Sequence, residues 1–122
     1  MVDQAVYERL LAAARVQETV FYGEVAQLLG VQAEDPSGSG EVAERLAEIS
    51  RQEVAEGRPM LSSIVVRVED HLPGPELMRL GHELHQVAEG EDEVGFAVRQ
   101  IKMVHAYWQE KPVFGSEAET AI

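Results

Sequence analysis

Two stretches of the sequence decide the fold: Thr19-Val-Phe-Tyr-Gly-Glu-Val-Ala-Gln-Leu-Leu-Gly30 and, further along the chain, Gly57-Arg-Pro-Met-Leu-Ser-Ser-Ile-Val-Val66. The first opens with an extended segment, Thr19 to Phe21, and continues into a short helix whose apolar residues share one face and which Gly30 ends. The second leads into a run dense in β-branched residues, which predicts a strand over Ser63 to Val68. We therefore expect one small sheet built from these two extended segments.

Helical periodicity surrounds both stretches. Apolar residues recur at helical spacing from Ala5 to Gln17, with Asp3 placed to stabilise the start of this first helix. Residues 33–40 read AEDPSGSG, a concentration of turn formers that predicts a loop, with Ser39 as the N-cap of a third helix. Gly57 is expected to end that helix.

The second half of the chain predicts two further helices. His71-Leu-Pro-Gly-Pro75 reads as a turn, and a fourth helix is expected from Leu77 to Gly90. Asp92 then opens a fifth helix. The fold class expected is α+β and mainly helical, with these two helices at its C-terminal end.

The fifth helix carries apolar residues on two sides, with Phe96, Met103 and Tyr107 opposite its main apolar face. One interpretation is that both sides are covered within the domain, in part by the tail around Val113-Phe114. The other is that Phe96, Met103 and Tyr107 form a self-association surface, which predicts a homodimer.

The length and the net charge of the chain limit the classes of function that it can have. We expect one domain over residues 1–122, with a small acidic tail at residues 116–122 that is mobile. The chain holds 22 acidic and 10 basic residues, a formal charge of −12, which disfavours DNA and anionic membranes and favours a basic protein partner. No apolar run is long enough to span a membrane, and the N-terminus lacks a signal-peptide pattern, so a cytoplasmic protein is expected.

The chemistry available to the chain is limited in the same way. The absence of cysteine excludes disulfides, thiol nucleophiles and zinc-thiolate sites. Phosphate-binding, dinucleotide-binding and serine-hydrolase motifs are missing as well, so the sequence predicts neither a cofactor nor an enzyme.

The two stretches together resemble the winged-helix domain of the alkylguanine DNA alkyltransferases and their non-enzymatic alkyltransferase-like relatives. Val20-Phe-Tyr-Gly-Glu-Val-Ala26 is similar to the segment that enters the helix-turn-helix of that family, and Phe96 to Trp108 to its closing helix. Where the family carries Pro-Cys-His-Arg, this chain reads Pro59-Met-Leu-Ser62, so alkyl transfer is not expected. The turn at Pro73-Gly-Pro75 leads into a helix where the family returns with a second wing strand.

The resemblance implies a DNA contact for Tyr22, because the aligned tyrosine of the family helps to rotate a nucleotide out of the duplex. The alternative is that Tyr22 packs its short helix against the core. Arg45, Arg51 and Arg58, with Ser62, are candidates for an anion-binding patch, although salt bridges to neighbouring glutamates are the commoner arrangement. The arginine that the family places on its recognition helix has no counterpart, and Glu41, Glu44 and Glu48 stand in that region.

The fourth helix offers a candidate metal site. His82, His85 and Glu89 would share one face of a continuous fourth helix, where they would converge on a divalent ion, although a solvated polar face is the commoner role for such residues.

Three hypotheses follow from the sequence. The first is a non-catalytic interaction module that self-associates and binds a basic protein through its acidic surface. The second is a DNA-binding accessory or regulatory protein of alkyltransferase-like type. The third is a small enzyme or metal-binding protein that works through the fourth helix.

Overall fold

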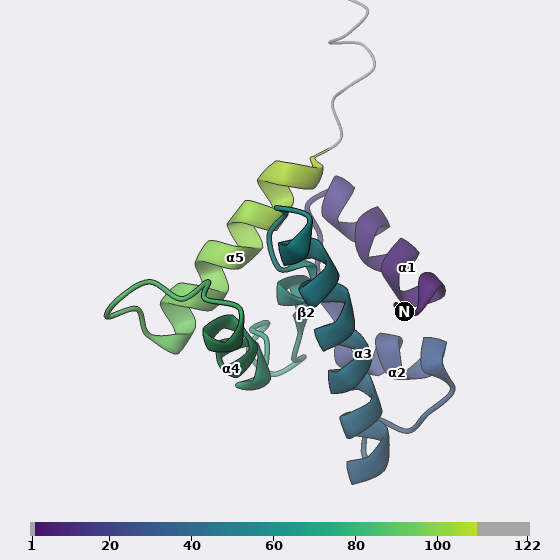
Figure 1. The fold of residues 1–122 in the computed structure, drawn as a ribbon. Helices are drawn as coiled ribbons and strands as arrows, with labels where there is room; N and C mark the ends of the chain where they lie inside the picture. The colour runs from purple at the N-terminus through teal and green to yellow at the C-terminus, as the bar shows by residue number, and fades with distance from the viewer. Residues whose placement is uncertain (1, 110–122) are drawn as a thin grey trace, which may run out of the picture.

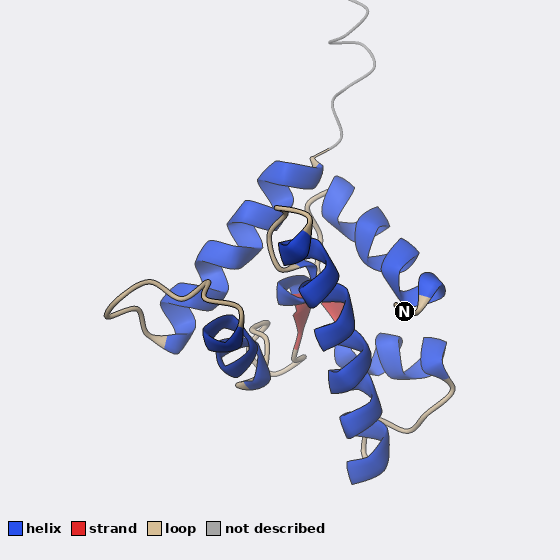
Figure 2. Ribbon diagram, in the orientation of Figure 1, coloured by secondary structure: helices blue, strands red, loops and turns tan. Residues whose placement is uncertain are grey.

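A computed structural model describes residues 2–109, which form five α-helices, one 3-10 helix and a two-stranded sheet (Figures 1 and 2). The mainly helical α+β class expected from the sequence is confirmed. The expected tail at residues 116–122 and the segment Val113-Phe114 lie outside the described residues. In chain order the elements are α1 (Gln4–Arg15), β1 (Val20–Phe21), α2 (Tyr22–Leu29), α3 (Pro36–Ala55), η1 (Leu61–Ile64), β2 (Val65–Val66), α4 (Glu76–Glu83) and α5 (Glu93–Trp108).

The sheet joins the two stretches that decide the fold. Strand β1 pairs in parallel with β2, Val20 opposite Val65 and Phe21 opposite Val66. The strand expected over Ser63 to Val68 is therefore shorter than predicted. The chain before it turns into the 3-10 helix η1, where the Ser63 N–H donates to the Met60 carbonyl at 3.0 Å, so these residues are not extended.

The 3-10 helix η1 lies at the centre of the molecule, packed against α1, α3 and α5. Its Leu61 and Ile64 are fully buried in the main core, together with apolar residues of α1, α2 and α3. A second, smaller core is formed where Met60, Leu80 and Phe96 meet, and it joins α4 to α5. The sequence around Pro59 thus supplies the segment on which α1, α3 and α5 pack, and Met60 extends it to α4.

Helix α3 begins earlier than predicted, because the segment expected to be a loop contributes its first turn. Pro36 occupies the start of the helix, where its missing N–H costs nothing, and Asp35 rather than Ser39 is the N-cap. Gly38 is buried inside this turn, and a Cβ there would lie 1.9 Å from the Gln32 carbonyl oxygen. The glycine therefore serves a close approach of two backbone segments and does not mark a loop.

Helix α4 ends earlier than predicted, at Glu83 and not near Gly90. His85 lies just beyond it with φ of 59°, in the left-handed region, so the backbone has left the helix there. Residues 67–75 form a turn and lead directly into α4, and residues 2–109 contain no strand beyond β1 and β2.

Candidate interaction site

A concave site of about 280 Å³ lies next to Tyr22, and we call it the Tyr22 pocket. One side comes from α3 and the opposite side from the turn that precedes α4. Its lining residues are Ser39, Val42 and Ala43 of α3; Gly74, Pro75 and Glu76 at the start of α4; and Tyr22, Ala33 and Arg67. A second hollow of about 50 Å³ shares Tyr22, Ala43 and Glu76 with it, so the two adjoin.

Small side chains on α3 create the space for this pocket. Ser39, Ala43 and Ala47 follow one another at intervals of four residues and therefore lie on one face of the helix. Ala43 lines both hollows, and Ala47 lines the smaller one. Larger side chains at these positions would fill the gap between α3 and α4.

Tyr22 is held in place by the turn before α4. Its hydroxyl oxygen accepts a hydrogen bond from the Gly74 N–H at 2.9 Å, which ties the start of α2 to a segment 52 residues away. Partial burial raises the pKa of Tyr22 above its ordinary value, and the nearby Glu76 acts in the same direction. The side chain that the resemblance assigns to DNA thus has a structural partner and also lines the pocket.

Some polar groups of the pocket already have hydrogen-bond or ion-pair partners within the protein, and others do not. Arg67 is paired with Asp70 through Nη2 to Oδ2 at 2.6 Å and Nε to Oδ1 at 3.2 Å. Ser39 donates its hydroxyl proton to the Pro36 carbonyl at 3.1 Å, which leaves the Ser39 oxygen able to accept. The exposed carboxylate of Glu76 makes no ion pair within residues 2–109.

The arginines proposed for an anion-binding patch are each paired with glutamate. Arg45 contacts Glu41 at 3.3 Å and Glu48 at 3.0 Å along α3. Arg51 bonds Glu83 of α4 at 2.8 Å. Their charge is compensated, as expected for the commoner arrangement, and the structure does not unite them with Arg58 into one patch.

Arg58 belongs to a partly buried network instead. It makes two bonds to Glu53, from Nε to Oε1 at 3.0 Å and from Nη2 to Oε2 at 2.9 Å. The Tyr7 hydroxyl of α1 donates to the same Glu53 carboxylate at 3.0 Å, and the guanidinium lies 5.8 Å from the centre of the Trp108 ring. Glu53 is fully buried, so its carboxylate belongs to the interior and not to the acidic surface.

Ser62 is also mainly an interior group. It is 6% exposed, and its hydroxyl lies 2.7 Å from that of Ser50. The Ser62 N–H donates to the same Ser50 oxygen at 3.1 Å, so this pair links η1 to α3. Ser62 reaches only the floor of the smaller hollow and not the surface patch proposed for it.

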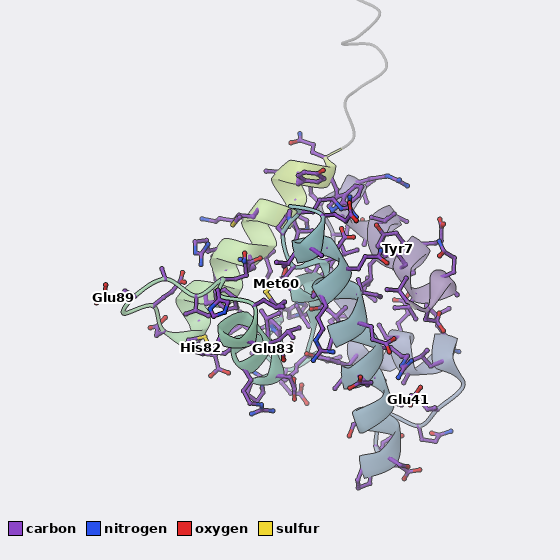
Figure 3. The ribbon with its side chains drawn as sticks, viewed as in Figure 1. Tyr7, Glu41, Met60, His82, Glu83 and Glu89 are labelled. Carbon is purple, nitrogen blue, oxygen red and sulfur yellow. The ribbon has the colours of Figure 1, made fainter. Side chains whose placement is uncertain are left out.

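The metal-site candidate does not form. Among residues 2–109, no three histidine or acidic side chains converge closely enough to hold a metal ion. The prediction assumed a helix that continues through His82, His85 and Glu89, but α4 ends at Glu83. Figure 3 shows Glu89 at the far end of the following loop, well away from His82 on α4.

The proposed self-association surface on α5 is only partly exposed. Phe96 has no exposed area and packs in the second core, so its inclusion in this surface was wrong. Met103 and Tyr107 are 40% and 53% exposed, and Val98 is exposed as well. The outer face of α5 is therefore apolar, with Lys102 in its middle.

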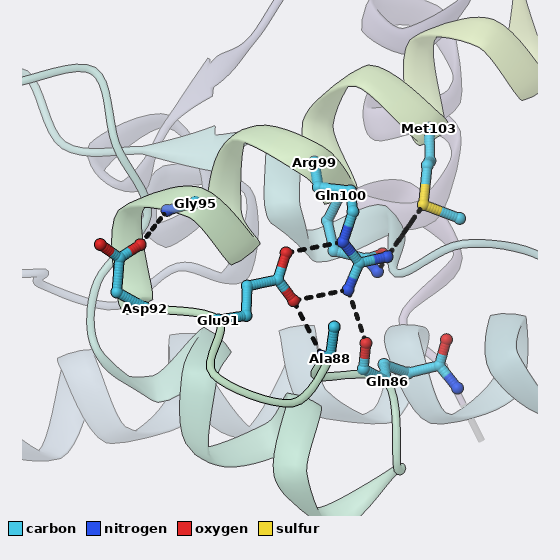
Figure 4. A network of polar contacts seen from close by, with 8 residues as sticks. All are labelled: Gln86, Ala88, Glu91, Asp92, Gly95, Arg99, Gln100 and Met103. Atoms are coloured by element: carbon cyan, nitrogen blue, oxygen red, sulfur yellow. Dashed lines mark hydrogen bonds and ion pairs between the residues drawn. The ribbon is translucent and has the colours of Figure 1, made fainter.

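A network at the start of α5 fixes the loop before it (Figure 4). Arg99 donates to both carboxylate oxygens of Glu91, at 2.7 and 2.8 Å, and to the Gln86 carbonyl at 2.7 Å. Glu91 also accepts from the Ala88 N–H at 2.9 Å. These hydrogen bonds, chiefly that from Arg99, lower the pKa of Glu91 to about 2.

No local pattern in the sequence indicates the Tyr22 pocket or the place of Glu76 in it. The pocket needs residues from α3 to face the turn at Gly74, and nothing local in the sequence reports that approach. The sequence does contain one pattern that relates to the pocket: the four-residue spacing of Ser39, Ala43 and Ala47 predicts a helix face made of small side chains.

Comparison of the chain with models of protein families, with curated proteins and with solved structures finds no significant match. None of the helices in residues 2–109 combines the length and the apolarity needed to cross a lipid bilayer.

Proposed function

We propose that this protein is a non-catalytic interaction module that binds a basic segment of a partner protein through the surface between α3 and α4. The observation that carries this proposal is the Tyr22 pocket, an apolar cavity whose only arginine is already paired with Asp70 and whose carboxylate, Glu76, is not paired within residues 2–109. A concave apolar site with a few polar groups is the usual form of a binding site.

The charge around the pocket supports the same partner. Glu44 lies next to Ala43 on the outer side of α3 and makes no ion pair within the described part of the chain, while Glu76 borders the opposite wall. Arg45 and Arg51, the cations nearest on α3, are both engaged with glutamates. The field at this surface is therefore negative, as in the protein as a whole, and attracts a basic partner.

A binding assay with matched variants tests this proposal. Fluorescence anisotropy would measure the affinity of the protein for a labelled peptide of mixed lysine, arginine and apolar residues, beside an acidic peptide of equal length and a short DNA duplex. We expect only the basic peptide to bind, more weakly as salt increases.

The control separates a specific surface from general attraction. Glu44→Gln combined with Glu76→Gln should weaken binding, whereas Glu8→Gln combined with Glu18→Gln, near α1, should change it little although the net charge is the same. Equal losses in both variants, tighter binding of the duplex, or no binding of the peptide would refute the proposal.

The DNA-binding alternative has less support. We propose that the chain is a distant relative of the alkyltransferase-like winged-helix domain, because β1 and β2 bring together the two segments that carry the resemblance. However, the outer side of α3, the counterpart of a recognition helix, carries Glu41 and Glu44 and offers no unpaired arginine among the described residues. Such a helix repels phosphate.

We also propose that the outer face of α5 mediates self-association with a second copy of the chain. Met103 and Tyr107 expose apolar area there, and Lys102 makes no ion pair within residues 2–109. Light scattering should show a dimer for the wild type and a folded monomer for Met103→Glu; a wild-type monomer at all concentrations would refute this surface.

A further inference from the structure

We propose that the Tyr22 pocket receives a single lysine or arginine side chain of the basic partner. This inference rests on the proposed function and assigns the anchor that the partner must supply. It follows from the balance of hydrogen-bond donors and acceptors that the pocket leaves unused.

Three of the groups around the pocket that can donate hydrogen bonds already do so within the protein. The Gly74 N–H is bonded to Tyr22 at 2.9 Å, and the Ser39 hydroxyl proton is directed to the Pro36 carbonyl at 3.1 Å. The Arg67 guanidinium is paired with Asp70 through two of its nitrogens. An anionic ligand would therefore meet a cation that is already neutralised.

The acceptors, in contrast, remain available. The carboxylate of Glu76 makes neither an ion pair nor a side-chain hydrogen bond within residues 2–109. The hydroxyl oxygens of Tyr22 and Ser39 each keep lone-pair capacity. A group that only donates fits this set, and among protein side chains these groups are the ammonium of lysine and the guanidinium of arginine.

The walls suit the remainder of such a side chain. Val42, Ala43 and Pro75 provide apolar surface for its methylene groups, while the charged head reaches Glu76 at the border of the cavity. The aromatic ring of Tyr22 also lines the cavity and attracts a cation placed near it.

Peptides that differ at one position test the anchor. Three short basic peptides would carry lysine, arginine or norleucine at a central site, and norleucine keeps the apolar chain without the charge. We expect the lysine and arginine peptides to bind wild-type protein about tenfold more tightly than the norleucine peptide, because a charge-assisted hydrogen bond to Glu76 is lost.

Three variants of the protein complete the test. Glu76→Gln should remove the preference for lysine and arginine over norleucine, and Ala43→Leu, which fills the cavity, should weaken all three peptides. Glu89→Gln, which removes an equal charge from the loop before α5, should preserve the preference. Circular dichroism would verify that each variant is folded.

The outcomes separate the anchor from the proposed function. If the basic peptides bind but norleucine serves as well as lysine, or if Glu76→Gln keeps the preference, the assignment of the pocket is overturned while the interaction module stands. If no basic peptide binds at all, both the anchor and the proposed function are refuted.

Discussion

Replacing Arg58 by alanine should destabilise the protein far more than replacing Arg51, although both arginines bind a glutamate of α3 or α4. Glu53, the partner of Arg58, is 0% exposed, and the Arg58 side chain is 22% exposed. In Arg58→Ala the carboxylate stays buried with only the Tyr7 hydroxyl bonded to it. Removing one member of a buried ion pair costs about 3–5 kcal/mol, and the remaining bond to Tyr7 places the expected loss at about 3 kcal/mol.

Arg51 provides the matched control because its ion pair with Glu83 lies at the surface, with side chains 42% and 51% exposed. Arg51→Ala should cost less than about 1 kcal/mol. Urea denaturation followed by circular dichroism would give both free energies of unfolding. Equal losses in the two variants would refute the structural role of Arg58, and a stable Arg58→Ala protein that has lost affinity for DNA would return this arginine to the nucleic-acid hypothesis.

Three further predictions concern the core, the start of α3 and the loop before α5. Phe96→Ala should lower the free energy of unfolding by about 3–5 kcal/mol in denaturation experiments, because Phe96 fills the second core; a smaller oligomer with unchanged stability would contradict this. Gly40→Ala should stabilise the protein by about 0.5–1 kcal/mol, since a Cβ at this position of α3 contacts nothing. Gly38→Ala should destabilise the protein by about 1–3 kcal/mol, because its Cβ would clash with the Gln32 carbonyl. Changes in the free energy of unfolding with the same sign for both variants would contradict the structure of this turn. NMR titration should give a pKa of about 2 for Glu91 and a higher pKa in Arg99→Gln, still below the ordinary 4.5 because the Ala88 N–H remains bonded to the carboxylate. Because the folded-state pKa is lowered, the Glu91–Arg99 pair stabilises the fold above pH 4.5 and loses its effect as the pH falls toward 2.

The elements predicted most accurately are those whose signals are local. The short helix after Phe21 ends at Gly30, which adopts φ of 74°, and Asp92 caps α5 through the Gly95 N–H at 2.7 Å. Asp3 likewise caps α1 through the Val6 N–H at 3.0 Å. In each case the residue type and the backbone geometry within one helical turn are sufficient to predict where the helix begins or ends.

The errors arise where a distant contact overrides a local preference. Gly38 reads as a loop residue, but its lack of a side chain serves the approach of the Gln32 carbonyl inside a helix. By helical periodicity Phe96 lies on an outer face of α5, but α4 covers it. Gly81 of α4 makes room for the Phe96 ring, since a Cβ at Gly81 would lie 2.4 Å from that ring. Glu53 looks like a surface glutamate, although its partners Tyr7 and Arg58 hold it in the interior.

The candidate site was less predictable than the fold for the same reason. The sequence draws attention to Tyr22 only through the resemblance, and its hydrogen bond to Gly74 and the adjoining cavity depend on a turn 52 residues away. Periodicity gives no information about which turn faces the small side chains of α3.

Mapping a bound basic peptide by NMR is the most direct test of the central claim. In a titration of isotope-labelled protein with the lysine peptide, the account predicts that amide signals of Tyr22, Ala43, Gly74 and Glu76 shift together and saturate at one peptide per chain. Contacts between the lysine methylene protons and Val42 should accompany these shifts. Shifts confined to the outer face of α5, or spread evenly over all acidic surfaces, would contradict the account.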